Sequence, residues 1–386
     1  MSTDINRIEA LAAAETLVVK VGTRVLTSPD GCLDRERIAI LAEQLCKVMD
    51  TGRTVVLVSS GAVGAGIGKL GLTERPRMLA DLQAVAAIGQ TDLMQAYQHA
   101  FAQHGRHAAQ VLLTAEDLRN RSSFLNLRNA LRQIAAYKAV PIINENDSVA
   151  VEELMTTFGD NDRLAASVAS LINDAMLVIL TDIDGLHTCH PSDPNSKRMS
   201  TVETINHEVI AMACDTQNSV SKGGMSSKLV AAQIATSHGH SVIIGPGRDD
   251  RVLEKILAGE SIGTLFQPEE KAIRGRLRWI DSAAALAGEL HVDAGAARAV
   301  GDRGKSLLAI GIRRVEGVFD RGEVVAIIDP QGAEIARGLI NYTSEEATKI
   351  IGLPSGQIAD VLGHCPYDTV IHCDNIATNS GLPLPR

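Results

Sequence analysis

Four clusters of polar and glycine residues each follow directly after a short apolar run that is typical of a buried strand. They are Lys20–Thr23, Ser59–Gly66, Asn144–Asp147 and Thr181–Gly185. In an open α/β sheet, ligands bind at the carboxyl ends of the parallel strands. A single cluster of this kind is better explained as turn chemistry. Four of them, at four strand ends, predict one shared binding site.

Two glycine-rich segments are of the type that binds anions. One is Ser60–Gly68, and the other is Lys222–Lys228, which opens a predicted helix over Leu229–Ser237. Backbone N–H groups and the helix dipole favour negative charge at such junctions. Together with the ammonium groups of Lys20 and Lys228, they indicate a phosphorylated donor and an anionic acceptor. Phosphoryl transfer needs positive charge and in-line positioning rather than a nucleophile on the protein.

Two standard nucleotide-binding motifs do not explain these segments. A G-x-x-x-x-G-K-[ST] motif is absent, because Val63 stands five residues before Gly68 and Leu70 follows Lys69. The run Gly66–Gly71 does fit G-x-G-x-x-G, but its first glycine comes eight residues after the predicted strand end. We therefore expect no dinucleotide site there.

Histidine and cysteine residues do not form a convincing metal site in the sequence. The run His187–His190 and the pairs His364-Cys365 and His372-Cys373 lack the spacing of structural zinc sites. The six cysteines contain no C-x-x-C pair and are too few for a disulfide framework in 386 residues. We expect no metal held by the protein itself and a Mg²⁺ ion that arrives on the phosphates of the nucleotide.

The elements that must position these residues alternate between strands and helices from Thr16 onward. Six runs with nearly all-apolar interiors predict a parallel sheet that is covered on both faces. Asp34 is expected to cap a helix over Arg35–Asp50 that ends at Gly52, and Thr114 with Asp117 to cap a helix running toward Tyr137. The predicted strands are Thr16–Val21, Thr54–Val58, Ala109–Leu113, Val140–Ile143, Met176–Leu180 and Ser241–Ile244.

The texture changes after residue 266. A charged connector is followed by short β-like segments over Leu307–Ile310, Glu323–Ile328 and Gly338–Asn341, which predict a second, mostly β domain. The expected organisation is an extension (residues 1–15), an α/β domain (16–266), a linker (267–286), a small domain (287–375) and a tail (376–386).

Charge and composition exclude several classes of protein. The chain carries a net charge of −9, and residues 287–386 hold nine basic against thirteen acidic side chains. An RNA-binding surface should be basic, and aromatic residues for base stacking are only 3% of the chain. Neither a signal peptide nor an apolar run of membrane-spanning length is found. We expect a cytoplasmic protein with no membrane or RNA partner.

The motifs resemble those of the amino acid kinase superfamily, in family order. They are Val18–Thr23, Val58–Ala62, Asn144–Asp147, Gly159–Asp162, Leu180–Asp182 and Gly223–Lys228. Within the superfamily, the pair Asn144–Asp147 and Gly159–Asp162 resembles the members that act on glutamate. The C-terminal region resembles a PUA domain. The resemblance implies a three-layer αβα sandwich with a mostly parallel sheet, followed by a small mostly-β domain.

This resemblance implies an ATP-dependent phosphorylation of the side-chain carboxylate of L-glutamate, as the first step of proline biosynthesis, with feedback inhibition by proline. It also implies a homo-oligomer, dimer or tetramer, and a downstream glutamyl phosphate reductase as a candidate partner. The implied catalytic residues are Lys20, Asp162 and Lys228, and the implied glutamate-binding residues are Ser60, Asn144, Asp147 and Asn161. The implied nucleotide-binding residues are Lys20, Thr181, Asp182, Lys222, Gly223, Gly224, Met225, Ser226, Ser227 and Lys228.

Three positions depart from the family pattern. Arg24 and Lys222 stand where Ser or Thr is usual, and His187 replaces a common Tyr. The first two bring positive charge toward the expected phosphates. Three alternatives stay open: a superfamily kinase acting on aspartate, N-acetylglutamate, carbamate or UMP; an RNA-binding protein; and a purely structural or regulatory role for the small domain.

Overall fold

The structure is a computed structural model. It describes residues 4–28, 31–119, 121–150, 161–190, 192–213, 224–269, 286–301, 304–365 and 367–378. The chain divides into two compact units, Met1–Glu270 and Lys271–Arg386, and each is described here by itself.

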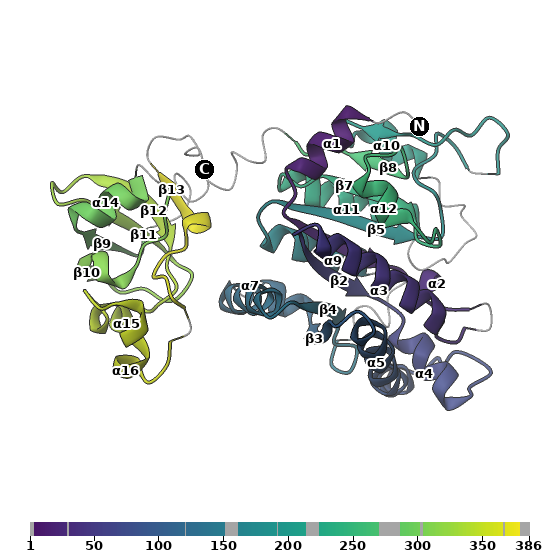
Figure 1. Cartoon of the computed structure of the whole chain (residues 1–386), viewed down its shortest axis with the longest axis horizontal. Coiled ribbons are helices and arrows are strands. Elements are labelled where there is room, and N and C mark those ends of the chain that lie inside the picture. Colours follow the sequence, from purple (N-terminus) through teal and green to yellow (C-terminus); the bar gives the residue numbers. More distant parts are fainter. Residues whose placement is uncertain are drawn as a thin grey trace. The chain divides into compact units, whose positions relative to one another are not determined.

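The first unit is built on an eight-stranded sheet with the order β3-β4-β2-β1-β5-β7-β8-β6 (Figure 1). Neighbouring strands are parallel, except that β8 runs antiparallel to β7. The six predicted strands are all present. The strands are β1 (Thr16–Val21), β2 (Thr54–Ser59), β3 (His107–Leu113), β4 (Ala139–Glu145), β5 (Ala175–Thr181), β6 (Thr201–Val202), β7 (Val242–Pro246) and β8 (Thr264–Phe266).

Helices cover both faces of this sheet, which confirms the predicted three-layer α/β fold. One core packs α1 (Ile5–Ala12), α2 (Thr23–Leu26), α3 (Arg35–Asp50), α4 (Ala62–Leu70), α5 (Leu79–Ala102) and α12 (Val252–Leu257) against one face. The other core contains α6 (Ala115–Arg119), α7 (Arg121–Ala136), α9 (Asn161–Leu171), α10 (His207–Met212) and α11 (Met225–Ser237). In the described part of the chain, no helix combines the length and the apolar character needed to cross a membrane.

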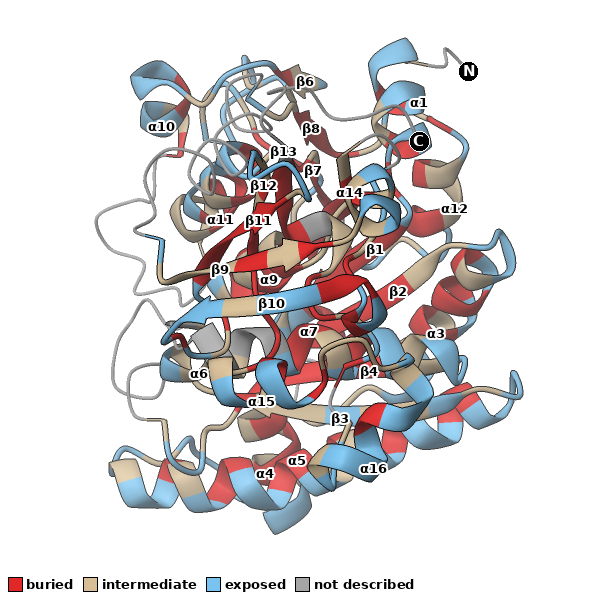
Figure 2. Ribbon diagram, turned by 90° about the vertical axis from the view of Figure 1, so that its left-hand side faces the viewer, coloured by how far each residue is buried: buried red, intermediate tan, exposed pale blue. Residues whose placement is uncertain are grey.

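The central strand β1 shows how the two cores are separated. Successive side chains of a strand point to opposite faces of the sheet. Leu17, Val19 and Val21 accordingly belong to one core and Val18 to the other, and all six residues of β1 are buried (Figure 2). Lys20 shares the side of Val18, so its side chain enters the layer of α9 and α11.

The helix ends follow the local chemistry of the sequence. The Asp34 side chain accepts a hydrogen bond from the Arg37 backbone N–H and starts α3. Gly52, just after the end of this helix, has a φ of +91°, as predicted for a left-handed terminus. Thr114 and Asp117 bond each other reciprocally at the start of α6. The chain is helical over Ala115–Arg119 (α6) and Arg121–Ala136 (α7), as expected from there toward Tyr137, and Asn120 between them lies outside the described residues.

The G-x-G-x-x-G run serves helix packing. Gly66 and Gly68 lie inside α4, and Gly71 ends it with a φ of +63°. A Cβ at Gly66 would stand 2.0 Å from the Val85 carbonyl oxygen of α5, and one at Gly89 of α5 would stand 1.9 Å from the Ala62 carbonyl oxygen. Glycines therefore let the backbones of α4 and α5 approach each other closely, which positions the middle of α5.

The N-terminal helix α1 is fixed to the first unit by a buried guanidinium. Arg7 is 1% exposed and donates to the backbone carbonyls of Ser200 (2.8 Å), Ile262 (2.6 Å) and Gly263 (3.1 Å). These carbonyls belong to segments near β6 and β8, so the start of the chain closes over that edge of the sheet.

The second unit has a five-stranded sheet with the order β10-β9-β11-β12-β13. The strands are β9 (Gly288–Val292), β10 (Ile312–Gly317), β11 (Val324–Ile328), β12 (Glu334–Leu339) and β13 (Ile376–Thr378), and the helices are α14 (Ala294–Gly301), α15 (Ser344–Lys349) and α16 (Ile358–Leu362). The mostly-β character is confirmed.

Two predicted strands of this unit were misplaced. Leu307–Ile310 is not a strand: Leu307 makes one isolated bridge to Ile371, and Ala309–Gly311 is a turn of 3₁₀-helix. This run is apolar because Leu307 and Ala309 are buried in the core, and burial alone does not distinguish a strand from other structure. The strand expected over Gly338–Asn341 ends at Leu339 and begins earlier.

The close approach of α4 and α5 gives a stability prediction. Gly89→Ala puts a methyl group against backbone atoms that cannot move aside, so the helices must separate. We expect a loss of about 2–3 kcal/mol, measured by denaturant unfolding. Gly245→Ala is the matched control, because its new Cβ would lie at an ordinary van der Waals distance of 3.5 Å from the nearest atom, Gly263 Cα. Equal stability of both variants would contradict the packing role of Gly89.

Candidate active site

Five strand ends lie level along one edge of the first sheet. Ile143 pairs with Val58, Ser59 with Val21, and Val21 with Leu180, while Thr181 pairs with Pro246. The residues that follow β4, β2, β1 and β5 therefore meet at this edge, as the sequence predicted.

A buried cluster of charges lies beneath this edge. The Lys20 Nζ atom is 2.7 Å from Asp162 Oδ1, and the Lys228 Nζ atom is 3.2 Å from Asp162 Oδ2. The three side chains are 1%, 0% and 3% exposed. Ser227 also donates to Asp162 Oδ2, at 3.0 Å. One carboxylate thus holds two ammonium groups in place, and two neighbouring ammonium groups are suited to an anionic ligand.

Three elements bring this cluster together. Lys20 comes from β1, Asp162 from the first turn of α9, and Lys228 from the first turn of α11. Gly224 is the N-cap of α11, and its carbonyl oxygen lies 2.9 Å from the Ser227 hydroxyl, whose single proton it shares with Asp162 Oδ2. Met225 and Ser226 complete the first turn. Lys222 and Gly223, also predicted to bind the nucleotide, lie outside the described residues.

A second buried cluster consists of amides and hydroxyls. Asn161 Nδ2 lies 2.7 Å from the Ser59 carbonyl oxygen, 2.8 Å from Asn144 Oδ1 and 3.0 Å from Ser60 Oγ, and its two N–H groups are shared among these three acceptors. Asn144 Oδ1 also accepts the Glu145 backbone N–H at 2.9 Å. The structure therefore joins Ser60, Asn144 and Asn161, which the family resemblance assigned to one pocket.

Asp147, the fourth residue assigned to that pocket, lies in the turn after β4. Burial, together with the nearby charge of Glu145, raises the pKa of Asp147 to about 6, although the Arg75 guanidinium opposes the shift. An ionised carboxylate in such a position gains strongly from a cationic ligand that restores its lost solvation.

Thr181 and Asp182 lie at the end of β5. Thr181 donates to Asp182 Oδ1 at 3.0 Å, and the Arg24 guanidinium lies 2.8 Å from Asp182 Oδ2. Burial alone would raise the pKa of Asp182, but the hydrogen bonds from Arg24 and Thr181 lower it. Arg24, one of the departures from the family pattern, therefore brings a positive charge that Asp182 balances.

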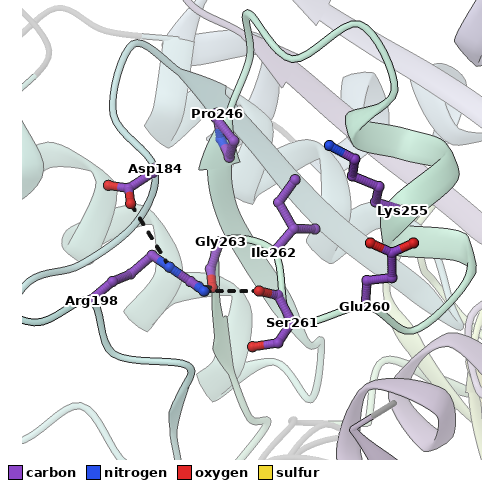
Figure 3. Close-up of a pocket in the computed structure, with 8 residues that line it drawn as sticks. All are labelled: Asp184, Arg198, Pro246, Lys255, Glu260, Ser261, Ile262 and Gly263. Atoms are coloured by element: carbon purple, nitrogen blue, oxygen red, sulfur yellow. Dashed lines mark hydrogen bonds and ion pairs between the residues drawn. The ribbon is translucent and has the colours of Figure 1, made fainter. Parts of the chain in front are cut away.

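A cavity of about 520 Å³ opens beside the ends of β5 and β7 (Figure 3). Arg198 crosses it, pairing with Asp184 at 3.9 Å and donating to the carbonyls of Ser261 and Gly263. This cavity could not be predicted from the sequence, because the residues that line it come from segments far apart in the chain. The lining residues are Asp184, Arg198, Pro246, Lys255, Glu260, Ser261, Ile262 and Gly263.

The histidines of the sequence motifs make local contacts. The two ring nitrogens of His187 contact Asp184 at 2.7 Å and Ser196 at 3.0 Å. Among the described residues, one group has the geometry to hold a metal, namely Glu289, His291 and Glu316 on β9 and β10. Arg314 already contacts His291 at 3.1 Å and Glu316 at 2.8 Å there.

Two family models match this chain. The model of the amino acid kinase family matches residues 15–246, and that of the PUA domain matches residues 288–362. The chain belongs to the amino acid kinase family and carries a C-terminal PUA domain. Among solved structures, a carbamate kinase from Giardia lamblia bound to AMP-PNP aligns with a TM-score of 0.47 and 17% identity, covering 67% of this chain and 100% of that one.

Relatives of this chain are named glutamate 5-kinase. One from Rhodopirellula baltica is 54% identical over 370 residues, which is 96% of this chain and 95% of the relative. Another from Moorella thermoacetica is 46% identical over 368 residues, which is 95% of this chain and 97% of the relative. The similarity thus extends over both units and nearly the full length.

The buried cluster gives a prediction about stability and anions. Asp162→Asn leaves two buried ammonium groups without the carboxylate between them, which should cost about 3–5 kcal/mol in the free protein. Added ATP should recover more of the melting temperature in the variant than it adds to the wild type, because phosphate oxygens can replace the lost charge. Thermal unfolding with and without nucleotide measures both effects.

Asp250→Asn is the matched control for this experiment. Asp250 pairs with Arg37 at 2.6 Å, but its side chain is 65% exposed. A surface pair contributes about 0–1 kcal/mol, so this variant should unfold almost as the wild type does. An Asp162→Asn protein as stable as the control would show that the carboxylate does not hold the lysines.

Proposed function

We propose that the chain transfers the terminal phosphoryl group of ATP to the side-chain carboxylate of L-glutamate, forming L-glutamyl 5-phosphate, the first step of proline biosynthesis. The observation that carries phosphoryl transfer is the pair of buried ammonium groups around Asp162 at the strand ends. The relatives named glutamate 5-kinase support glutamate as the acceptor.

Lys20 and Lys228 contact the phosphates and neutralise the charge that develops on the transferring group. Asp162 holds both ammonium groups at fixed positions, so that they need not reorganise during transfer. The acceptor is a carboxylate, which is already ionised at neutral pH and has no proton to remove. No general base is therefore required, and Asp162 acts as an organiser.

A Mg²⁺ ion fits this site when the nucleotide carries it. The Asp162 carboxylate is engaged by two lysines, and Asp182 is engaged by Arg24. These residues suit a metal that is held by phosphate oxygens rather than by the protein. When bound there, Mg²⁺ supplies further charge neutralisation on the phosphates, while the lysines orient the terminal group.

The amide cluster and Asp147 form the acceptor pocket in this proposal. Asp147 pairs with the ammonium group of glutamate, and Ser60, Asn144 and Asn161 supply hydrogen bonds beside it. The structure joins the last three residues directly. Feedback inhibition by proline, as implied by the resemblance, would act at or beside this pocket.

The nucleotide lies on the other side of Lys20 in this proposal. Thr181, Asp182 and the segment from Lys222 to Lys228 contact it, with the first turn of α11 directed at its phosphates. The cavity beside Pro246 is next to this region, because Pro246 pairs with Thr181. We assign the cavity to the nucleoside part of ATP.

The acceptor is tested by trapping the product. Wild-type protein is incubated with ATP, Mg²⁺, L-glutamate and hydroxylamine, which converts an acyl phosphate to a hydroxamate. We expect glutamate-dependent hydroxamate that proline suppresses, and a loss of about 100-fold or more in Lys228→Ala, as for removal of one charged group at a transition state. Lys47→Ala, which removes an exposed lysine paired with Glu43 and Glu254, is the control.

Parallel reactions with aspartate, N-acetylglutamate, carbamate and UMP, followed by ATP consumption, decide between acceptors. Turnover with one of these and none with glutamate would keep phosphoryl transfer and reject the substrate. No turnover with any of them would reject the enzymatic role and favour a binding function of the PUA domain. Its acidic balance argues against RNA. A homo-oligomer and a reductase that consumes the product remain part of the proposal.

The raised pKa of Asp147 gives a pH dependence. Asp147 must be ionised to pair with the substrate ammonium, and its pKa in the free protein is about 6. The KM for glutamate should therefore rise as the pH falls through 6, by up to about tenfold per pH unit, while kcat changes less. Steady-state kinetics between pH 5 and 8 measure this effect.

Two variants separate Asp147 from other titrating groups. Glu145→Gln removes a negative charge that raises the pKa of Asp147, so the inflection should move to lower pH. Asp147→Asn should bind glutamate weakly with no inflection near pH 6. The raised pKa means that the folded state binds a proton at Asp147 more readily than the unfolded chain does. Ionisation of Asp147 between about pH 4 and 6 therefore destabilises the folded wild type, and Asp147→Asn should be more stable than the wild type at pH 7. An unchanged inflection in both variants would contradict the assignment.

A further inference from the structure

The buried side chain of Gln90 lies beside the acceptor pocket. Gln90 lies in the middle of α5, is 9% exposed, and accepts a hydrogen bond from Asn144 Nδ2 at 2.8 Å. We propose that Gln90 is a positioning residue for the acceptor: it holds the Asn144 amide in place and thereby keeps the oxygen of Asn161 free for the substrate. This inference rests on the proposed function, because it concerns how glutamate binds.

The backbone of α5 places Gln90 where it can reach the strand end. Its neighbour Gly89 packs against α4, where a Cβ would stand 1.9 Å from the Ala62 carbonyl oxygen and 2.3 Å from the Gly66 backbone nitrogen. Figure 1 shows α4 and α5 next to each other at one end of this unit. The close contact with α4 fixes the position of α5 in the fold. The Gln90 amide is therefore held within hydrogen-bonding distance of Asn144.

Two backbone groups fix the polarity of the amide cluster. The Glu145 N–H donates to Asn144 Oδ1, and the Ser59 carbonyl accepts from Asn161 Nδ2. Neither backbone group can exchange donor for acceptor, so the Asn144 oxygen must face Glu145 and its nitrogen must point the other way. This nitrogen is buried and needs an acceptor, which the Gln90 Oε1 atom supplies.

The consequence for Asn161 follows from the same count. All three of its hydrogen bonds use the nitrogen, and its Oδ1 atom is buried with no partner among the described residues. A buried carbonyl oxygen without a partner is uncommon and costs stability. It is a ready acceptor for an N–H donor, and the glutamate ammonium, which Asp147 attracts, is such a donor.

Without the Gln90 oxygen, the two backbone anchors remain, but the Asn144 nitrogen would be buried without an acceptor. This is costly, so the Asn144 side chain would shift toward another partner. Asn161 would then lose the Asn144 oxygen as an acceptor, and its amide would be held less firmly, by the Ser59 carbonyl and Ser60 alone. The phosphate-binding residues Lys20 and Lys228 lie on β1 and α11 and make none of these contacts, so phosphoryl transfer itself should be spared.

The test replaces the amide by a side chain of similar size. In Gln90→Leu, we expect the KM for glutamate to rise about 10- to 100-fold, with kcat within about threefold and the KM for ATP unchanged. Gln95→Leu is the matched control, because Gln95 is an exposed glutamine on the same helix. It should leave all three constants unchanged. Gln90→Met, which is more flexible, is the second variant in case the leucine protein does not fold.

A double-mutant cycle separates positioning from general support of the fold. If Gln90 acts through Asn144, then Gln90→Leu should change the KM for glutamate by less than about threefold in an Asn144→Ala background. A purely structural role would instead give effects that add, and would raise the KM for ATP as well. Either of those results overturns the proposal.

The failure of this inference and that of the proposed function give different results. A wild-type protein with no glutamate-dependent hydroxamate overturns the function and this inference with it. An active wild type with an unchanged KM for glutamate in Gln90→Leu and Gln90→Met overturns the positioning role alone. A selective rise in that KM, absent in Gln95→Leu and absorbed by Asn144→Ala, supports it.

Discussion

The site depends on one buried carboxylate between two buried ammonium groups. Burying charges is costly unless each has a partner with good geometry. Asp162 meets this condition only if β1, α9 and α11 all stand in register, since each supplies one member of the cluster. The strand that carries Lys20 and the N-terminal turns of α9 and α11 are therefore subject to the same constraint.

The strand order then separates two kinds of chemistry. The order β4-β2-β1-β5-β7 puts the amide cluster at the ends of β4 and β2, and Thr181 and the cavity at the ends of β5 and β7. Lys20 on β1 lies between them. In the proposed reaction, the acceptor and the nucleotide would approach from opposite sides of this central strand, and the phosphoryl group would move across it. A sheet of parallel strands provides this arrangement because all of its carboxyl ends open on one edge.

The strands and the helix starts of the first unit could be predicted from the sequence, because each depends on residues that are close together in the chain. Continuous apolar runs revealed the buried strands, and Asp34 and Thr114 marked helix starts through bonds to residues three positions away. The strand predicted over Leu307–Ile310 was wrong. Leu307 and Ala309 are apolar because they are buried in the core, and the segment forms an isolated bridge rather than a strand. The roles of Gln90 and Arg198 could not be predicted from the sequence. Each depends on a hydrogen-bond partner that is 54 or 65 residues away along the chain, respectively.

The cluster of Lys20, Asp162 and Lys228 differs from the amide cluster in which substitutions it should tolerate. In the proposed reaction, the lysines and Asp162 would meet a phosphoryl group, whose geometry is the same for every acceptor, so substitutions there should remove activity with all of them. The amide cluster would instead contact the acceptor, and its polarity is anchored by two backbone groups, the Glu145 N–H and the Ser59 carbonyl. In our proposal, side chains around those anchors, Gln90 among them, hold the amides in position for the acceptor. A change of acceptor would therefore require new residues at β2, β4, α5 and Asn161 of α9, while Lys20, Asp162 and Lys228 stay as they are.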